Sequence, residues 1–332
     1  MLKTKRLILI LIFVFLSLTA CTPPVKEIKK VEVKPAPKIV VQPIEVKAPK
    51  PDVDAPVQQD VLILLSSSAK IYQKIAEHLM GALGERAVQI ILSGLPAQDR
   101  AMMEDIKASS TQQIVAVGLK AALAAKNFED KKIIYTQVMT HEKFQAENIK
   151  GVSSLPSPEK LFSDWKKLSP KLSKVAIISG DNLEGYLKRA KVAAKKNGIK
   201  LVVELVKSDK GFIYKSKKFK PDVGGQWILP DNRILSGKAL KEVMAYSSRR
   251  GRQIVVFSPK LLSFGGFFYV SPNLEMIAAG VLQRLSDSAG KKFIPGMSVL
   301  PIMDHTMGIN QNIARQLNLT IPNAYRKYIH AN

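Results

Sequence analysis

The sequence predicts an α/β fold in which two doubly wound parallel-sheet lobes follow one another along the chain. Short, continuous runs of Val, Ile and Leu recur between residues 60 and 260, and small polar residues follow most of them. Amphipathic segments with helical spacing separate these runs. Strands that are apolar on both faces and alternate with helices are typical of parallel sheets covered on both sides. The roughly 270 residues after position 60 are enough for two such lobes.

The first lobe begins with the apolar run 61–65, three serines and an amphipathic helix. Ile71, Ile75, Leu79 and Leu83 recur every fourth residue, which places them on one helix face. A serine before this helix suits its N-terminal cap. The remaining strands expected here are 88–92, 114–118 and 133–135, with one helix running through Met103 and another over 120–126.

The second lobe begins at Ser157-Pro158-Glu159, where proline at the first helical position favours a helix start. A later helix over 183–197 ends at Gly198, a suitable C-terminal cap. The strands expected in this lobe are 175–178, 201–205, one ending within 227–232, and 254–257, and Ser236 opens a further helix.

The first 20 residues are typical of a secretory signal peptide, with Lys3, Lys5 and Arg6 before the apolar stretch 7–20. That stretch is shorter than the about 20 apolar residues of a membrane-spanning helix. Leu18-Thr19-Ala20-Cys21 resembles a bacterial lipobox, which implies that residues 1–20 are removed and Cys21 carries palmitate-type acyl chains. The alternative is an uncleaved anchor helix. Since Cys21 is the single cysteine, no disulfide is expected.

Residues 21–59 are rich in Pro, Lys, Val and Glu, and they predict a semi-rigid tether rather than a folded unit. A β-edge segment at 31–33 is the alternative, which the frequent prolines disfavour. Thr22 stands where Asp would favour retention in the inner membrane of Gram-negative bacteria. The expected location is therefore the cell envelope, facing the periplasm, with the outer membrane favoured.

The chain is strongly basic, with a formal net charge of +24. Residues 151–260 contain 24 basic and nine acidic side chains, so the second lobe holds most of the excess. An exported lipoprotein does not meet nucleic acid, and no such partner is expected. An anionic lipid surface, an acidic envelope polymer, a partner protein or a merely solvated lysine-rich surface all remain open.

Catalytic and metal-binding patterns are weak. Ser67-Ser68-Ala69-Lys70 has the S-x-x-K spacing of serine acyl enzymes, but the companion Lys-Thr-Gly is missing, and an N-capping serine beside a solvated lysine explains it. The four histidines are isolated in sequence, and no glycine-rich phosphate loop is present. We therefore expect no enzyme activity, no cofactor and no metal.

Four segments appear in the order found in one family of binding proteins: "IVAVGLKAALAA", "WILPDNRILS", "FGGFFYVSPNLEMIAAGVL" and "GINQNIARQLNLTIP". Together they resemble the substrate-binding proteins of ABC transporters, in the tryptophan/tyrosine-like branch, over about residues 60–330. The resemblance implies a type I periplasmic-binding fold. Its two hinged lobes would close over a small solute and present it to an inner-membrane ABC permease.

The resemblance also implies a discontinuous chain with three hinge strands. One lobe would comprise residues 60–152 plus about 267–300, and the other residues 153–266. The hinges would lie near Ser153, near Gly265 and Gly266, and within 298–304. Residues 301–332 are not assigned to either lobe.

The family pattern points to ligand-binding positions at the ends of the strands. Members often carry Gly-Thr before an Ala-rich helix, where the hydroxyl and the helix N-terminus hold a ligand carboxylate. The match here is Gly118-Leu119, without the hydroxyl, which favours an apolar or aromatic ligand portion. Asp231 in the Pro-Asp-Asn turn would pair with a ligand ammonium. The full set of candidates is Ser66, Ser67, Ser68, Gly118, Leu119, Asp181, Asn182, Asp231 and Asn232.

Two functions follow. The first is a lipid-anchored solute receptor of an uptake system, binding a small amino-acid-like or aromatic metabolite. The second is a non-enzymatic envelope lipoprotein that keeps the fold as an interaction or regulatory scaffold. Leu119 and the sorting expected from Thr22 favour the second function. Serine caps and Asp-Asn turn chemistry are the structural alternatives for the candidate residues.

Overall fold

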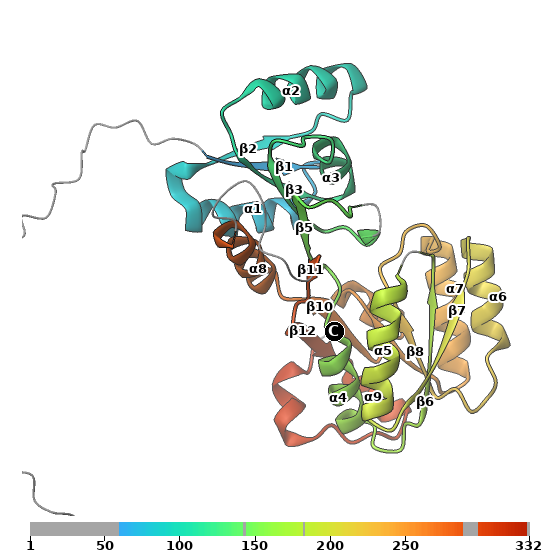
Figure 1. Cartoon of the computed structure of the whole chain (residues 1–332). Helices are drawn as coiled ribbons and strands as arrows, with labels where there is room; N and C mark the ends of the chain where they lie inside the picture. Colours follow the sequence, from blue (N-terminus) through green and yellow to red (C-terminus); the bar gives the residue numbers. More distant parts are fainter. Residues whose placement is uncertain (1–59, 142–143, 182, 288–297, 331–332) are drawn as a thin grey trace, which may run out of the picture. The chain divides into compact units, whose positions relative to one another are not determined.

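The computed structural model describes residues 60–141, 144–181, 183–287 and 298–330 (Figure 1). These residues belong to one compact unit, residues 55–332. The predicted signal peptide, Cys21, Thr22 and the predicted tether lie outside the described residues, as does Asn182. No helix in the described ranges is long and apolar enough to cross a membrane.

The first lobe is built on a six-stranded sheet whose paired strands are all parallel. Its apolar residues fall into two clusters, one on each face of the sheet. Helices α1 (Lys70–Leu83) and α8 (Leu274–Ser286) contribute to one cluster, and α2 (Pro96–Ala108) and α3 (Leu119–Ala125) to the other. The short 3-10 helix η1 (Gly84–Arg86) follows α1. The strands in spatial order are β11 (Val299–Leu300), β5 (Ile149–Val152), β4 (Lys132–Thr136), β3 (Gln113–Val117), β1 (Val61–Leu65) and β2 (Ala87–Ile91).

The second lobe repeats this order, with one antiparallel strand, β12, at the sheet edge. Helices α4 (Pro158–Leu168), α5 (Glu184–Lys196) and α9 (Gln311–Gln316) and the 3-10 helix η4 (Asn323–Tyr328) share one apolar cluster. Helices α6 (Asp209–Lys218) and α7 (Gly237–Arg249) share the other. The strands in spatial order are β12 (His305–Ile309), β10 (Phe268–Pro272), β9 (Gln253–Val256), β8 (Gly225–Ile228), β6 (Lys174–Ser179) and β7 (Lys200–Leu205).

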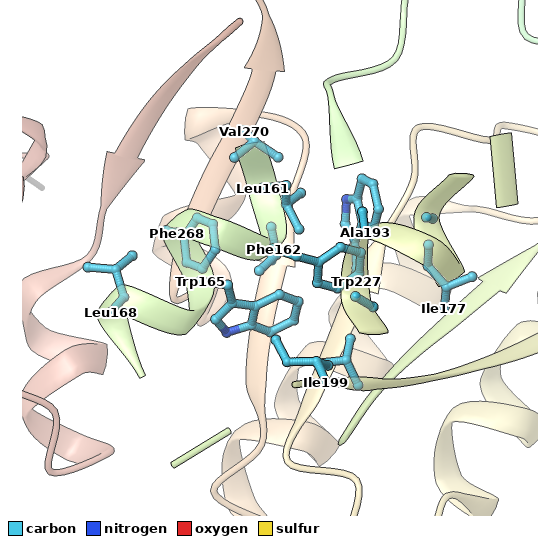
Figure 2. Packing of buried hydrophobic residues seen from close by; sticks show 14 of the residues in the cluster. Leu161, Phe162, Trp165, Leu168, Ile177, Ala193, Ile199, Trp227, Phe268 and Val270 are labelled. Atoms are coloured by element: carbon cyan, nitrogen blue, oxygen red, sulfur yellow. The ribbon is translucent and has the colours of Figure 1, made fainter. Parts of the chain in front are cut away.

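Aromatic side chains form the centre of the second lobe's core (Figure 2). The rings of Phe162 and Trp165 stack at 6.4 Å between centroids, and Trp227 meets Phe162 edge-on at 5.8 Å. Trp165 is fully buried, and its indole Nε1 donates a hydrogen bond of 2.6 Å to Gln253 Oε1. This packing ties α4 to β8 through Trp227 and to the first residue of β9 through Gln253.

The chain passes between the two sheets three times. It leaves β5 at Val152 for α4, leaves β10 at Pro272 for α8, and leaves β11 at Leu300 for β12. The two doubly wound parallel-sheet lobes predicted from the sequence are confirmed. The first and third crossings lie where hinges were expected.

The second crossing differs from the expectation. The sequence assigned residues from about 267 to the first lobe, but β10 pairs with β9 and β12 in the second sheet. Gly265 and Gly266, expected at a hinge, lie inside the second lobe, in the turn after η3 (Pro259–Phe264). Gly265 has φ of +105°, which suits glycine at the end of that 3-10 helix. Residues 305–330 of the unassigned C-terminal segment complete the second lobe through β12, α9 and η4.

Candidate functional site

A cavity of about 300 Å³ lies where the carboxyl ends of strands from both lobes meet the connecting segments. Gln137 enters it from the end of β4, Leu229 and Pro230 from the end of β8, and Phe257 from the end of β9. Ile71, in the first turn of α1, completes the wall from the first lobe. Doubly wound sheets bind ligands outside the carboxyl ends of their strands, so this cavity is the first candidate for a site.

The walls of this cavity are mainly apolar. Trp227 is 1% exposed and is held by the edge of Phe162 and by Tyr186, whose ring centroid lies 5.9 Å away. Phe257 is half-buried, and Ile71 is 40% exposed. Two aromatic residues in the lining, Trp227 and Phe257, favour a flat, apolar group in the cavity.

The segment 135–141 carries a cluster of unpaired polar atoms. Buried polar groups are normally hydrogen-bonded, so these atoms single out the end of β4, where Gln137 lines the 300 Å³ cavity and His141 lines a second cavity. The atoms without a hydrogen-bond partner among the described residues are Tyr135 Oη, Thr136 Oγ1, Gln137 Nε2, Thr140 Oγ1 and His141 Nδ1.

Gln137 combines an unpaired buried amide nitrogen with an unusual backbone conformation. Its side-chain Nε2 is buried and unpaired within the described part of the chain, and its backbone has φ of 58°. A left-handed backbone at a residue other than glycine costs about 1–2 kcal/mol. Such strain occurs at sites where position matters more than stability. The amide of Gln137 is therefore the polar group best placed to orient a ligand in the 300 Å³ cavity.

A second cavity, of about 470 Å³, borders the connecting segments as well, with His141, Ser153, Tyr186 and Arg189 among its walls. Burial lowers the pKa of His141 to about 4, so its imidazole is neutral at pH 7. Arg189 is already paired with Glu159 at 2.9 Å. The Ser153 hydroxyl accepts a hydrogen bond of 3.2 Å from Leu155 N. This cavity therefore presents the neutral imidazole of His141 and the hydroxyl of Ser153 beside the charged side chains of Glu184 and Arg189, each of which already has an ion-pair partner.

Two of the predicted ligand residues, Ser66 and Gly118, meet beside α3. Ser66 is buried, and its Oγ accepts a hydrogen bond of 2.8 Å from Ala121 N in the first turn of that helix. Gly118 has φ of 92°, and a Cβ there would lie 2.6 Å from Ser66 Oγ. Ser66 thus caps α3 from a distant strand, and the amide of Ala121 is no longer free for a ligand carboxylate. Leu119, next in the chain, is 40% exposed.

Two others, Asp181 and Asp231, meet at the guanidinium of Arg233. Asp231 is 1% exposed, and it accepts bonds of 2.8 and 2.7 Å from Arg233 and 3.1 Å from Gly180 N. The side chain of Asp181 is 68% exposed, and it accepts a hydrogen bond of 2.9 Å from Arg233 Nη1. Burial opposes ionisation of Asp231, but these hydrogen bonds hold its pKa below the usual range. Arg233 therefore takes the position beside Asp231 in which we expected a ligand ammonium.

The remaining candidates have no clear cavity contact. Ser67 and Ser68 are exposed, and Ser67 Oγ accepts a hydrogen bond of 3.4 Å from Ala69 N, as a serine near a helix start does. Asn232 is exposed. None of the candidates in the described ranges lines either of the two cavities, although Pro230 beside Asp231 does.

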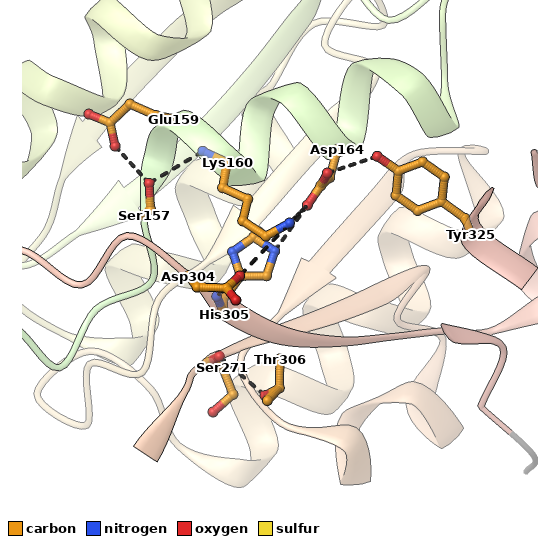
Figure 3. Close-up of polar contacts among 9 residues, drawn as sticks. All are labelled: Ser157, Glu159, Lys160, Asp164, Ser271, Asp304, His305, Thr306 and Tyr325. Atoms are coloured by element: carbon orange, nitrogen blue, oxygen red, sulfur yellow. Dashed lines mark hydrogen bonds and ion pairs between the residues drawn. The ribbon is translucent and has the colours of Figure 1, made fainter. Parts of the chain in front are cut away.

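A buried polar cluster lies where the third crossing meets the second lobe (Figure 3). Asp164 on α4 accepts a hydrogen bond of 2.8 Å from Tyr325 Oη. Its carboxylate also contacts Lys160 Nζ and His305 Nε2, each at 3.2 Å. Burial raises the pKa of Asp164, but the hydrogen bonds from His305 and Tyr325 outweigh it, so the pKa is lowered. Lys160 also reaches Asp304, in the crossing itself, at 3.9 Å. The cluster fastens the C-terminal segment and the crossing to α4.

Sequence reasoning missed Gln137, Trp227, Phe257 and His141. Trp227 and Phe257 were recognised only as strand residues. Gln137 and His141 follow the strand expected at 133–135, so the rule that ligands bind at strand ends would have indicated them. The left-handed backbone of Gln137 has no sequence signal, because glutamine rarely adopts it.

Comparison with solved structures identifies the fold. A ligand-free, open substrate-binding protein with adhesive properties from Clostridium difficile aligns with a TM-score of 0.60 at 16% identity, covering 81% of this chain and 97% of that one. An ABC domain in complex with L-Trp from Streptococcus pneumonia aligns with 0.55 at 18%, covering 82% and 98%. A periplasmic ribose ABC transporter protein from Conexibacter woesei aligns with 0.52 at 12%, covering 82% and 98%.

At such low identity, these alignments establish the fold alone. The chain has the type I periplasmic-binding-protein fold, as its two mostly parallel sheets and their interleaved helices indicate. No protein-family model matches the sequence, and no curated protein matches it significantly.

Proposed function

We propose that this chain is a lipid-anchored, extracytoplasmic solute-binding protein of an ABC-type uptake system. The observation that carries the proposal is the 300 Å³ cavity, to which both lobes contribute and whose wall includes Gln137, a residue with a buried amide nitrogen that has no hydrogen-bond partner in the described part of the chain. The fold supports it, since the solved neighbours include proteins described as binding L-Trp or as ribose ABC transporter components. The three crossings would act as the hinge, with Ser153 in the first.

The solute that fits is a neutral molecule with a flat apolar portion. The groups expected to hold an amino acid have intramolecular partners. Asp231 accepts hydrogen bonds from Arg233, and the Ala121 amide at the N-terminus of α3 donates to Ser66. Trp227 and Phe257 provide apolar walls, and Gln137 provides one neutral polar contact. An ionised ligand would lose its hydration without gaining a charged partner from these groups.

A thermal-shift screen tests this proposal. Neutral heterocycles, nucleosides and aromatic metabolites should raise the melting temperature, because a ligand that binds only the folded state stabilises it by mass action. Zwitterionic amino acids at the same concentration should raise it less. A screen in which only zwitterions stabilise the protein would refute the neutral-solute assignment while leaving solute binding intact.

The alternative is an envelope lipoprotein that keeps the fold as an interaction or regulatory scaffold. The intramolecular pairing of Asp231 and the capping role of Ser66 favour it, because both remove contacts that the resemblance assigns to a ligand. If no solute in the screen raises the melting temperature, and substitutions at Gln137 change only stability, the scaffold function replaces the receptor function.

The anchoring and address of the protein remain proposals based on its leader. Cys21 would carry the lipid, and Thr22 would direct the protein to the outer membrane of a Gram-negative host. Density-gradient fractionation that finds the protein with inner-membrane markers would contradict this address. It would also strengthen the link to an inner-membrane permease.

A further inference from the structure

Helices α6 and α7 lie side by side over one face of the second sheet, and their outward surface is basic. On α6 the exposed residues are Lys210, Tyr214, Lys217 and Lys218, whose spacing places them on one stripe. On α7 the exposed charged residues are Lys238, Lys241 and Arg249. We call the surface formed by these seven residues together with Phe264 the basic-aromatic face.

Very little negative charge offsets this face. Within 183–287, which the structure describes without a gap, Glu242 is the acidic residue of α7, and it pairs with Lys217. Asp209, at the start of α6, accepts a hydrogen bond of 2.9 Å from Ser236 Oγ and is half-buried. The described part of the chain shows no ion pair for Lys210, Lys218, Lys238 or Lys241.

Aromatic rings are interleaved with these cations. Tyr214 is 59% exposed, with the Lys218 ammonium 5.6 Å from its ring centre. Phe264 is 44% exposed, and the Lys241 ammonium lies 5.6 Å from its ring centre. Large exposed rings are costly in water, whereas rings and lysines side by side suit the interface between lipid headgroups and water.

We infer that the basic-aromatic face binds the surface of an anionic phospholipid bilayer. The charge is complementary, and lysines are flexible point charges that suit a diffuse anionic surface, whereas bidentate recognition of a single group favours arginine. Neither cavity described above includes a residue of this face, so it offers a surface rather than a pocket. A chain held near a bilayer by a tether would meet that surface at high effective concentration.

The test uses the mature chain from residue 21 with Cys21→Ser, which carries no lipid. Flotation with phosphatidylcholine vesicles that contain phosphatidylglycerol should recover the protein, and pure phosphatidylcholine vesicles should not. Each lysine near an anionic surface contributes about fivefold to binding, and salt screens the attraction. The variant K210Q/K218Q/K238Q/K241Q should therefore bind at least about tenfold more weakly.

The matched control is K171Q/K191Q/K195Q/K196Q. It removes the same charge from exposed lysines on and before α5, across the sheet from α6 and α7. Its binding should change by less than that of the face variant. Equal losses in the two variants would overturn the inference in favour of undirected attraction by net charge.

Two further outcomes would also overturn it. One is the absence of any preference for phosphatidylglycerol at low salt. The other is binding to soluble polyglutamate that the face variant loses while its vesicle binding stays unchanged, which would assign the face to an acidic polymer. Circular dichroism and melting temperature should match between the two variants, since every substituted side chain is exposed.

Discussion

Replacing Gln137 by glycine should change stability and ligand affinity in opposite directions. The φ of 58° costs a residue with a side chain about 1–2 kcal/mol, and glycine removes that cost. Glycine also gives the unfolded chain more freedom, which opposes the gain by about 0.5–1 kcal/mol. The free energy of unfolding should therefore stay constant or rise by up to about 1.5 kcal/mol, as measured by urea denaturation.

Affinity should fall in the same variant. The lost amide removes one neutral hydrogen bond to the solute, worth about 0.5–1.5 kcal/mol, which is about a twofold to tenfold loss in affinity. Isothermal titration calorimetry with a solute identified in the thermal-shift screen would measure it. A residue needed only for folding would not give this combination.

Asn318→Gly is the matched control, because Asn318 is the other residue besides glycine with positive φ in the described ranges, at 53°. It follows α9 and lines neither cavity, so its replacement should leave affinity unchanged. The reasoning fails if Gln137→Gly destabilises the protein by more than about 1 kcal/mol or binds the solute as well as the native chain does.

Three further predictions follow from the same contacts. Asp231→Ala should destabilise the protein by about 2–4 kcal/mol in urea denaturation, because it removes a buried carboxylate and leaves Arg233 and the amide of Gly180 without that partner. Asp181→Ala should cost less than about 1 kcal/mol, because the Asp181 side chain is exposed. An Asp231→Ala protein with native stability and weakened solute binding would instead make the carboxylate a ligand contact. Tyr325→Phe should cost about 1.5–3 kcal/mol at pH 7, since its hydroxyl donates to ionised Asp164. The pKa of that carboxyl is lowered in the folded state, so its stabilisation is present above the unfolded pKa of about 3.9 and is lost as pH falls through the folded pKa. The melting-temperature difference between Tyr325→Phe and the native chain should accordingly shrink in acid. A constant difference down to low pH would contradict a hydrogen bond from Tyr325 to an ionised Asp164. Finally, mass spectrometry of the exported protein should find an acylated Cys21 at its N-terminus, and an intact leader would refute the predicted cleavage.

The strands were the most predictable part of the fold. The run 61–65 coincides with β1, and 201–205 lies within β7, because continuous Val, Ile and Leu with a polar turn after them leave few other structures. Helix α6 was not predicted from the sequence. Its residues Asp209–Lys218 carry four lysines, and only Phe212 and Ser216 are buried, so its apolar face is too narrow to stand out.

The boundary between the lobes was less predictable. The segment 268–272 is apolar enough for either sheet, and only pairing with β9 and β12 assigns it to the second. Sequence patterns report which side chains are buried, whereas they do not report which partner buries them. The same limitation applies to β11, which has two residues.

The candidate ligand residues follow strands, but the described ones line neither cavity. The sequence shows that Asp231 follows a strand, but it does not show that Arg233, two residues later, folds back onto it. Ser66 likewise finds its partner in Ala121, 55 residues away. In both cases an intramolecular donor satisfies the side chain before any ligand arrives, and that competition depends on tertiary geometry.

The pairing of α1 with α8 constrains the order in which the chain can fold. A chain made from its N-terminus presents β1 to β5 long before β11, which completes the first sheet, and α8, which packs against α1. The second sheet waits in the same way for β12, near the end of the chain. Contacts so distant in sequence form slowly, because a long loop must close first. Neither sheet can therefore be completed before the segment near residues 299–309 is available, and until then the edge strands β5 and β10 lack their last partners.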